Sequence, residues 1–204
     1  MRMIRQTLAV GGLVAATTSC GDVVRQGLSP VYLVISQLQA AQGNRPTQFG
    51  GILTSDVVTV VTTPTPPCPC PTVFNDLGQV ILRISPKDIG APGTTTTPST
   101  NNEVTITRFH VSYRRADGRN TPGVDVPFAF DGAATGTVPA AGTLTLVFEL
   151  VRHAAKEEAP LVQLINSATL ITTIADVTFY GQDQVGNQIS VTGSIQIDFG
   201  NFGD

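Results

Sequence analysis

Two cysteines separated by a single proline, Cys68 and Cys70, have the clearest potential for chemistry in this chain of 204 residues. Two thiols so close together could bind a soft metal ion or pass between dithiol and disulfide forms. Each cysteine precedes a proline, which favours extended backbone and directs the two side chains apart, so a ring closed between them is strained. Metal binding would need further ligands from His110 or His153, which nothing in the sequence brings near. We therefore expect a structural or incidental role, with any disulfide formed under strain or with another chain, and no metal site.

A cationic stripe is the second candidate for chemistry. On the predicted strand 103–113, Arg108 and His110 alternate with apolar residues, and Arg114 continues the same parity. Residues two apart on a strand point to the same side, so these side chains should line the solvent face, with Arg119 close by in the following turn. Such a surface could bind an anionic glycan, a phosphate or an acidic face of another protein.

Charged residues in this chain also allow a simpler interpretation. Exposed arginines commonly pair across strands, here with acids such as Asp125 or Glu149, or are merely solvated. His153 precedes Lys156 and two glutamates, but this group opens a predicted surface helix and favours a solvated helix face. Asp183 lies in a predicted turn, where aspartate is favoured for backbone reasons, and a calcium ion would need about 6 to 8 oxygen ligands.

The usual sequence signatures of catalysis are absent. We find no Gly-x-Ser-x-Gly elbow, no His-Glu-x-x-His, no phosphate-binding loop and no dinucleotide fingerprint. Two histidines leave few general bases, and the absence of tryptophan removes the usual stacking platform for sugars. The sequence predicts a protein that is not an enzyme and has no cofactor, while a hydrolase built on scattered carboxylates stays open as an alternative.

Composition favours a folded protein that does not bind nucleic acid. Apolar residues make up 41% of the chain, which argues against disorder, while charged residues make up only 13%. Threonine occurs 27 times, so the surface should be polar but mostly uncharged. The formal net charge of −3 argues against a surface built to grip nucleic acid.

The N-terminal residues have the pattern of an export signal. Arg2 and Arg5 are followed by an apolar run over 8–16 and then by small residues that end at Cys20. A positive start, an apolar centre and a small-residue exit predict a signal peptide over residues 1–19. The apolar run is too short to persist as a transmembrane helix, which needs about 20 apolar residues.

This N-terminus resembles the signal of bacterial lipoproteins, in which the cysteine after the cleavage site carries the lipid. The resemblance implies a lipidated Cys20 and a tether over residues 20–29. Gly21 stands where an aspartate favours the inner membrane in the lipoproteins that it resembles, so the outer membrane is implied. Thr17 departs from the pattern, which usually has an aliphatic residue there. The alternative is a secreted domain without lipid, cut near Thr18 or Ser19.

Eight runs rich in β-branched residues, separated by Gly, Pro, Asn and Asp, predict strands. They are residues 31–39, 52–61, 79–85, 103–113, 124–130, 143–151, 170–180 and 188–199. The last run alternates apolar and polar residues, as expected of a strand with one buried face. One short helix is expected at 153–159.

Turn residues predict two hairpins. Residues 170–180 should pair with 188–199, and 103–113 with 124–130. A change in the apolar parity predicts a bulge near Arg108. Gly193 interrupts an apolar face and predicts a second bulge.

These elements predict an all-β protein, an antiparallel sandwich of two sheets with one short helix. The pattern resembles immunoglobulin-like or fibronectin type III domains of bacterial surface proteins, without a specific motif. The domain should occupy residues 30–204, with Pro/Thr-rich loops at 62–72 and 91–101. We expect an exported binding or scaffolding module of the cell envelope, whose ligand the sequence does not identify. A thiol or metal protein using Cys68 and Cys70 is the remaining alternative.

Overall fold

The computed structural model describes residues 28–61, 70–88, 90 and 97–203. The predicted signal peptide and most of the predicted tether lie outside the described residues, as do Cys20 and Cys68. Within the described part, strands make up most of the chain and three short helical turns interrupt them.

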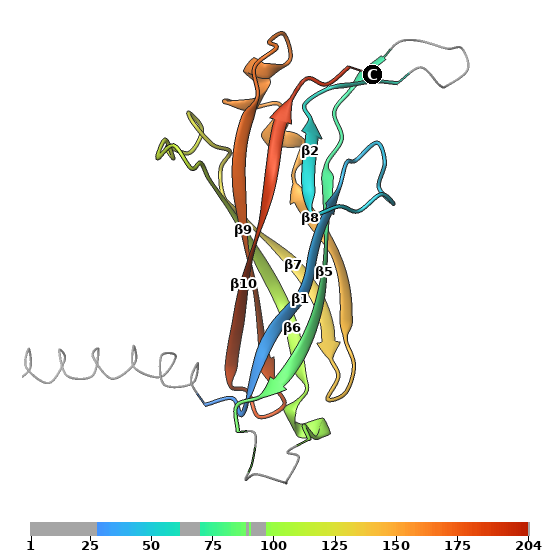
Figure 1. Cartoon of the computed structure of the whole chain (residues 1–204), viewed down its shortest axis with the longest axis vertical. Coiled ribbons are helices and arrows are strands. Elements are labelled where there is room, and N and C mark those ends of the chain that lie inside the picture. The colour runs from blue at the N-terminus through green and yellow to red at the C-terminus, as the bar shows by residue number, and fades with distance from the viewer. Residues whose placement is uncertain (1–27, 62–69, 89, 91–96, 204) are drawn as a thin grey trace, which may run out of the picture.

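The elements follow one another along the chain as Figure 1 shows. The strands are β1 (Val31–Ala41), β2 (Ile52–Asp56), β3 (Thr59–Val61), β4 (Cys70–Thr72), β5 (Asp76–Pro86), β6 (Val104–Arg114), β7 (Phe130–Val138), β8 (Leu144–Val151), β9 (Ile171–Asp183) and β10 (Gln188–Gly200). The helical turns are the 3-10 helices η1 (Thr100–Asn102) and η2 (Leu161–Leu164) and the α-helix α3 (His153–Lys156).

Most strands belong to two sheets. The smaller sheet has the order β1-β5-β8, the larger has the order β2-β10-β9-β6-β7, and β3 and β4 pair separately. Neighbouring strands run antiparallel except β2, which is parallel to β10. The predicted all-β fold with mostly antiparallel sheets arranged as a sandwich is confirmed, and α3 is the one α-helix of the described residues.

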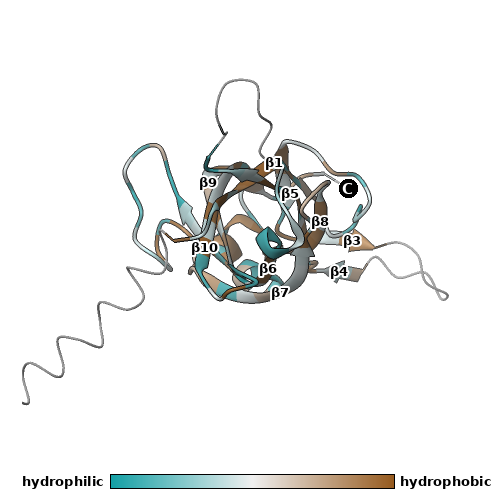
Figure 2. Ribbon diagram, turned by 90° about the horizontal axis from the view of Figure 1, so that it is seen from below, coloured by the Kyte–Doolittle hydropathy of each residue, from teal (hydrophilic) through white to brown (hydrophobic). Residues whose placement is uncertain are grey.

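The core lies between the two sheets, because alternate residues of the long strands point inward. In β9, Val177 and Phe179 are fully buried while their neighbours are partly exposed. At the centre, the ring of Phe148 on β8 lies 5.1 Å from that of Phe109 on β6 and 5.2 Å from that of Phe179. Figure 2, seen from the end where β1 begins, shows the strands of both sheets enclosing this interior. Contacts between aromatic rings of the two sheets therefore hold the sheets together.

One predicted strand is displaced along the chain. Residues 124–130 were expected to return beside β6, but β7 begins only at Phe130 and pairs with β6 as far as Val138. The alternating apolar residues before Phe130 lie in a loop, where Val126 is buried and Phe128 is exposed. The prediction for this stretch is wrong because the chain turns back on itself there, with the backbone N–H of Gly123 donating to the carbonyl oxygen of Val126 at 2.8 Å, and of the alternating residues before Phe130 only Val126 packs on the core.

A second predicted strand, 52–61, is divided in two. β2 ends at Asp56, whose carboxylate accepts a hydrogen bond from the backbone N–H of Val58 at 3.4 Å. The chain then leaves the larger sheet, and β3 pairs with β4. The end of the predicted loop 62–72 therefore belongs to a strand that begins at Cys70.

The predicted hairpin of residues 170–180 with 188–199 is confirmed. β9 and β10 pair along their whole length without a break in register. The predicted bulge in β6 is also confirmed, because the register shifts between Ile106 and Arg108 on both sides of the strand.

Gly193 has a different role from the predicted bulge. It lies opposite Val177 in regular pairing, so the prediction of a bulge there is wrong. A Cβ atom at Gly193 would lie 2.7 Å from Ile35 Cδ1 of β1. The glycine therefore allows the first strand of the smaller sheet to approach β10 closely.

Candidate functional site

The outer face is the solvent-exposed side of the larger sheet, and it carries the predicted cationic stripe. Arg108 Nη1 lies 3.0 Å from Asp131 Oδ1 on β7, and His110 Nδ1 lies 3.2 Å from the same oxygen. His110 and Asp131 meet because β6 and β7 pair them directly. The guanidinium of Arg108 also lies 3.7 Å from the centre of the Tyr180 ring, which it covers.

Arg114, the last residue of β6, pairs with Asp176 of β9. Its Nε lies 2.6 Å from Asp176 Oδ2, and the hydroxyl of Ser194 donates to Asp176 Oδ1 at 2.5 Å. Burial alone would raise the pKa of Asp176, but the hydrogen bonds from Arg114 and Ser194 bring it below its ordinary value. The same contact raises the pKa of Arg114, so both groups stay ionised near neutral pH.

The stripe residues lie on one face as predicted, and both arginines have a carboxylate partner there. Those partners are Asp131 and Asp176, not the expected Asp125 or Glu149. Glu149 lies on β8 in the other sheet, and Asp125 lies in the loop after β6. Ligand binding by the stripe stays a prediction, now for a surface whose arginine charges are matched.

Hydroxyl groups cover other parts of the outer face. The side-chain oxygens of Thr178 and Thr192 lie 2.8 Å apart, and those of Thr105 and Thr137 lie 3.2 Å apart, in both cases across neighbouring strands. These side chains bond to each other, so the surface is polar and largely self-satisfied.

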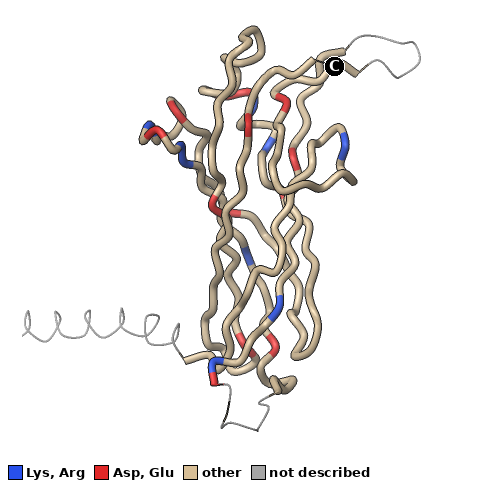
Figure 3. Tube along the Cα trace, in the orientation of Figure 1, with Lys and Arg blue, Asp and Glu red and all other residues tan. Residues whose placement is uncertain are grey.

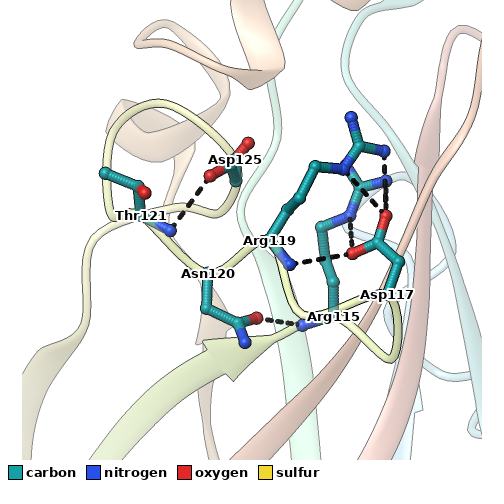
Figure 4. A network of polar contacts seen from close by, with 6 residues as sticks. All are labelled: Arg115, Asp117, Arg119, Asn120, Thr121 and Asp125. Atoms are coloured by element: carbon teal, nitrogen blue, oxygen red, sulfur yellow. Dashed lines mark hydrogen bonds and ion pairs between the residues drawn. The ribbon is translucent and has the colours of Figure 1, made fainter.

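The β6–β7 loop, residues 115–129, is the longest ordered connection between two neighbouring strands of the larger sheet. Asp117 organises it, accepting hydrogen bonds from Arg115 Nη2 at 2.7 Å and from Arg119 Nη2 at 2.8 Å (Figure 4). Its Oδ1 also accepts the backbone N–H of Arg119 at 3.1 Å. Bonds from Arg119 and then Arg115 lower the pKa of Asp117 from 3.8 to about 2. The carboxylate is therefore charged at any physiological pH.

Further polar contacts hold the rest of this loop. Gly118 supplies the turn with a φ of 81°, a conformation that other residues rarely adopt. The side-chain oxygen of Asn120 accepts the backbone N–H of Arg115 at 2.6 Å, and Asp125 Oδ2 accepts that of Thr121 at 3.1 Å. Figure 3 shows charges of both signs gathered in this loop. Long loops without regular structure are uncommon in compact domains, and ordered ones usually serve a function.

A shallow hollow of about 300 Å³ lies beside the loop, lined in part by Arg115, Asp117 and Leu170. Leu170 is 56% exposed, and the loop itself exposes Val124 by 66% and Phe128 by 51%. Arginine and aromatic side chains are enriched in protein–protein interfaces. This end of the sandwich therefore combines an ordered loop with the composition of a recognition surface.

No protein-family model, curated protein or solved structure matches the chain. The geometry of the outer face and of the β6–β7 loop is therefore the basis for assigning a function. The sequence placed Arg119 in a turn but gave no sign of this loop, because its apolar alternation was interpreted as a strand.

A buried polar junction joins α3 to both sheets. Lys156 Nζ lies 2.8 Å from Asp76 Oδ2, and each of these side chains is only 1% exposed. Lys156 also donates to the backbone oxygen of Asp56 on β2 at 2.8 Å. Asp76, at the start of β5, further accepts the hydroxyl of Ser55 at 2.6 Å and the backbone N–H of Gly43 at 2.9 Å. The buried charges are thus paired and hydrogen-bonded.

Sequence reasoning missed this junction. It predicted a solvated helix over 153–159, whereas α3 ends at Lys156 and directs that side chain into the core. The prediction is wrong for Lys156, although His153 is exposed. A lysine within a run of helix-forming residues carries no signal of burial, because burial depends on a carboxylate 80 residues away in the chain.

The remaining candidates have structural roles where they are described. Cys70 is disulfide-bonded, and the two other cysteines lie outside the described residues. Asp183 Oδ1 accepts the backbone N–H groups of Val185 at 3.1 Å and Asn187 at 2.8 Å, so it holds the β9–β10 turn.

The described residues were also considered as metal ligands and as membrane-spanning segments. They contain no group of three or more His, Cys, Asp or Glu placed to hold a metal ion. None of their helices has the length and apolar character needed to cross a bilayer.

Proposed function

We propose that this protein is an exported, lipid-anchored module of the cell envelope that binds or scaffolds another envelope protein. Cys20 carries the lipid at the outer membrane, and the sandwich is the folded domain that the tether holds. Support for export comes from the positive start, apolar centre and small-residue exit that precede Cys20.

The proposal that the protein binds a partner is supported by the position of the β6–β7 loop relative to the start of β1. β1, which follows the predicted tether in the sequence, begins at one end of the sandwich, whereas the β6–β7 loop lies towards the other end (Figure 1). A loop so placed points away from the membrane when the tether is anchored. Its internal hydrogen bonds fix its shape before a partner arrives, which reduces the entropy lost on binding.

Charge pairing favours a protein partner over an anionic glycan. Arg108 and Arg114 each contact an aspartate, and Arg115 and Arg119 share Asp117. These contacts leave little free positive charge to attract a polyanion. The exposed Phe128 and the hollow near Leu170 instead suit apolar side chains of a protein surface framed by polar groups.

Intact mass of the membrane fraction tests the anchor. We expect a mature chain that begins at Cys20 with added acyl mass, and release of a Cys20→Ser variant from the membrane. A mature chain without acyl mass would support the secreted alternative and overturn the lipid anchor.

Cross-linking in intact cells tests the binding surface. We expect an Arg119→Ala/Phe128→Ser variant to lose cross-linked partners that the wild type captures, because both changes alter the exposed part of the loop. The matched control is Arg108→Ala/Arg114→Ala, which removes two arginines of the outer face and leaves the loop unchanged. Equal loss in the control would assign binding to the outer face, and equal capture by all three proteins would dismiss both surfaces.

The proposal is of a binding protein and not of an enzyme. A screen with generic ester, peptide and glycoside substrates tests it, and turnover that tracks the purified protein would overturn it. Thiol titration of the folded protein tests the redox alternative, for which the disulfide at Cys70 predicts no reactive thiol there.

A further inference from the structure

The tether end of the sandwich brings together the start of β1, the end of β5 and two turns. Tyr32, Lys87 and Ser190 line one shallow hollow there, which places β1, β5 and β10 side by side. The register of β6 sets Val104 opposite both Val138 and Asp183, so the turns after β7 and β9 lie at the same end.

Large apolar side chains are exposed at this end. Leu28 is 59% exposed, Tyr32 is 57% exposed and Val185, at the tip of the β9–β10 turn, is 79% exposed. Lys87 lies 5.2 Å from the centre of the Tyr32 ring. The turn after β7, residues 139–143, contains no charged residue.

The Val185 tip is held outward by the fold. Asp183, which is buried, accepts the backbone N–H groups of both Val185 and Asn187, and the side chain of Asn187 donates to Asp183 Oδ2 at 2.9 Å. A fixed turn cannot fold its valine back onto the core, so the apolar side chain stays in contact with solvent unless something covers it.

The length of the predicted tether limits which surface can cover the exposed Val185 side chain. Eight residue steps separate Cys20 from Leu28, and at no more than about 3.6 Å for each step they span at most about 29 Å. With a lipid on Cys20, the end of the sandwich that exposes Tyr32 and Val185 is therefore confined close to the bilayer. The opposite end, with the β6–β7 loop, is farther away by the length of the strands (Figure 1).

We propose that the tether end is a membrane-contact surface, with Val185 and Tyr32 inserted among phospholipid headgroups. This inference rests on the proposed lipid anchor. Tyrosine and aliphatic side chains with a lysine nearby suit the bilayer interface, where an apolar body and a polar tip are both accommodated. The contact orients the sandwich with its strands away from the membrane plane and its β6–β7 loop outward.

Tryptophan fluorescence tests this orientation, because the chain has no tryptophan of its own. The acylated full-length protein is reconstituted in vesicles of phosphatidylethanolamine and phosphatidylglycerol with brominated acyl chains, which quench nearby indole rings. A Val185→Trp reporter should lose about half of its emission, since interfacial side chains lie about 5–10 Å into the boundary of headgroups and chains. The matched control is Val124→Trp, at a loop residue of the other end that is 66% exposed, and its emission should be unchanged.

The outcomes separate this inference from the proposed anchor. Quenching of both reporters means that the sandwich lies on its side, and quenching of neither means that the tether end stays in water, so either result overturns the inference while the anchor stands. Absence of acyl mass on the purified protein refutes the anchor itself, and this inference with it. Thermal unfolding of each variant compared with the wild type confirms that the reporters sit in a folded domain.

Discussion

The molecule pairs opposite charges in two contrasting settings. On the outer face, Arg108 and Asp131 lie 3.0 Å apart with side chains that are 51% and 60% exposed. In the buried junction, Lys156 and Asp76 lie 2.8 Å apart and each is 1% exposed. The distances are nearly equal, so the two pairs differ in their contribution to stability because of their surroundings. Water screens the charges of the exposed pair, so this pair contributes little. Removal of one partner of the buried pair leaves the other charge buried without solvent, which costs much more.

This difference separates the residues that define the fold from those available for recognition. The junction ties β5 of the smaller sheet to α3 and to β2 of the larger sheet, so it fixes how the two sheets meet there. The outer pairs set the charge of a surface at little gain in stability. Substitutions on such a surface can adapt it to a binding partner without unfolding the domain.

Loss of the buried lysine should have the largest effect. We expect Lys156→Met to lower the free energy of unfolding by about 3–5 kcal/mol, because it leaves the Asp76 carboxylate buried without its cation. Denaturation by urea at pH 7 measures the change.

A double substitution sharpens this result. In Lys156→Met/Asp76→Leu both charges are gone, and we expect most of the lost stability to return, since apolar replacements of buried pairs are often neutral. A single variant as stable as the wild type would mean that the junction contributes no more than a surface pair.

Ser55→Ala should have an intermediate effect. It removes the hydroxyl that donates to Asp76 Oδ2 at 2.6 Å but keeps the ion pair. We expect a loss of about 1–3 kcal/mol, the usual range when a buried acceptor loses one of its donors. The same urea titration applies, and near-ultraviolet circular dichroism confirms that the core remains packed. An unchanged midpoint would show that the lysine alone satisfies the carboxylate.

The fold could be predicted from the sequence because its strongest signals are local. Alternation over 188–199 and the turn before it were enough to predict the β9–β10 hairpin, and the change of parity near Arg108 was enough to predict the bulge in β6. Such patterns depend only on residues that are close in the sequence, so each strand can be recognised from its own residues.

The predictions that were wrong concern residues whose structure depends on contacts with distant parts of the chain. The loop over 124–129 alternates like a strand, and Gly193 breaks an apolar face like a bulge, but contacts from elsewhere in the fold decide both. Lys156 is the clearest case, since its partner lies on another element. The exposed arginines were found, yet the partner of Arg108 depended on the start of β7, which the sequence misplaced, and the partner of Arg114 depended on the pairing of β6 with β9.

The Arg108–Asp131 pair should contribute much less than the junction. A double-mutant cycle with Arg108→Ala and Asp131→Ala should give a coupling of about 0.2–1 kcal/mol, because both side chains are half exposed. The coupling should weaken further in 1 M salt, where charges are screened over about 3 Å. A coupling as large as the loss in Lys156→Met would remove the contrast between the two settings.

Asp117 should give the smallest effect, visible only in acid. The guanidinium groups of Arg119 and Arg115 lower its pKa from 3.8 to about 2, so its carboxylate stabilises the folded loop above pH 3.8. That contribution should fade as the pH falls from 3.8 towards 2, because protonation then breaks both contacts. Comparison of the wild type with Asp117→Asn at pH 7 and pH 2 measures it, and the two proteins should become alike at the lower value. A carboxyl resonance of Asp117 that titrates near 4 in nuclear magnetic resonance would mean that the loop is not held by this network.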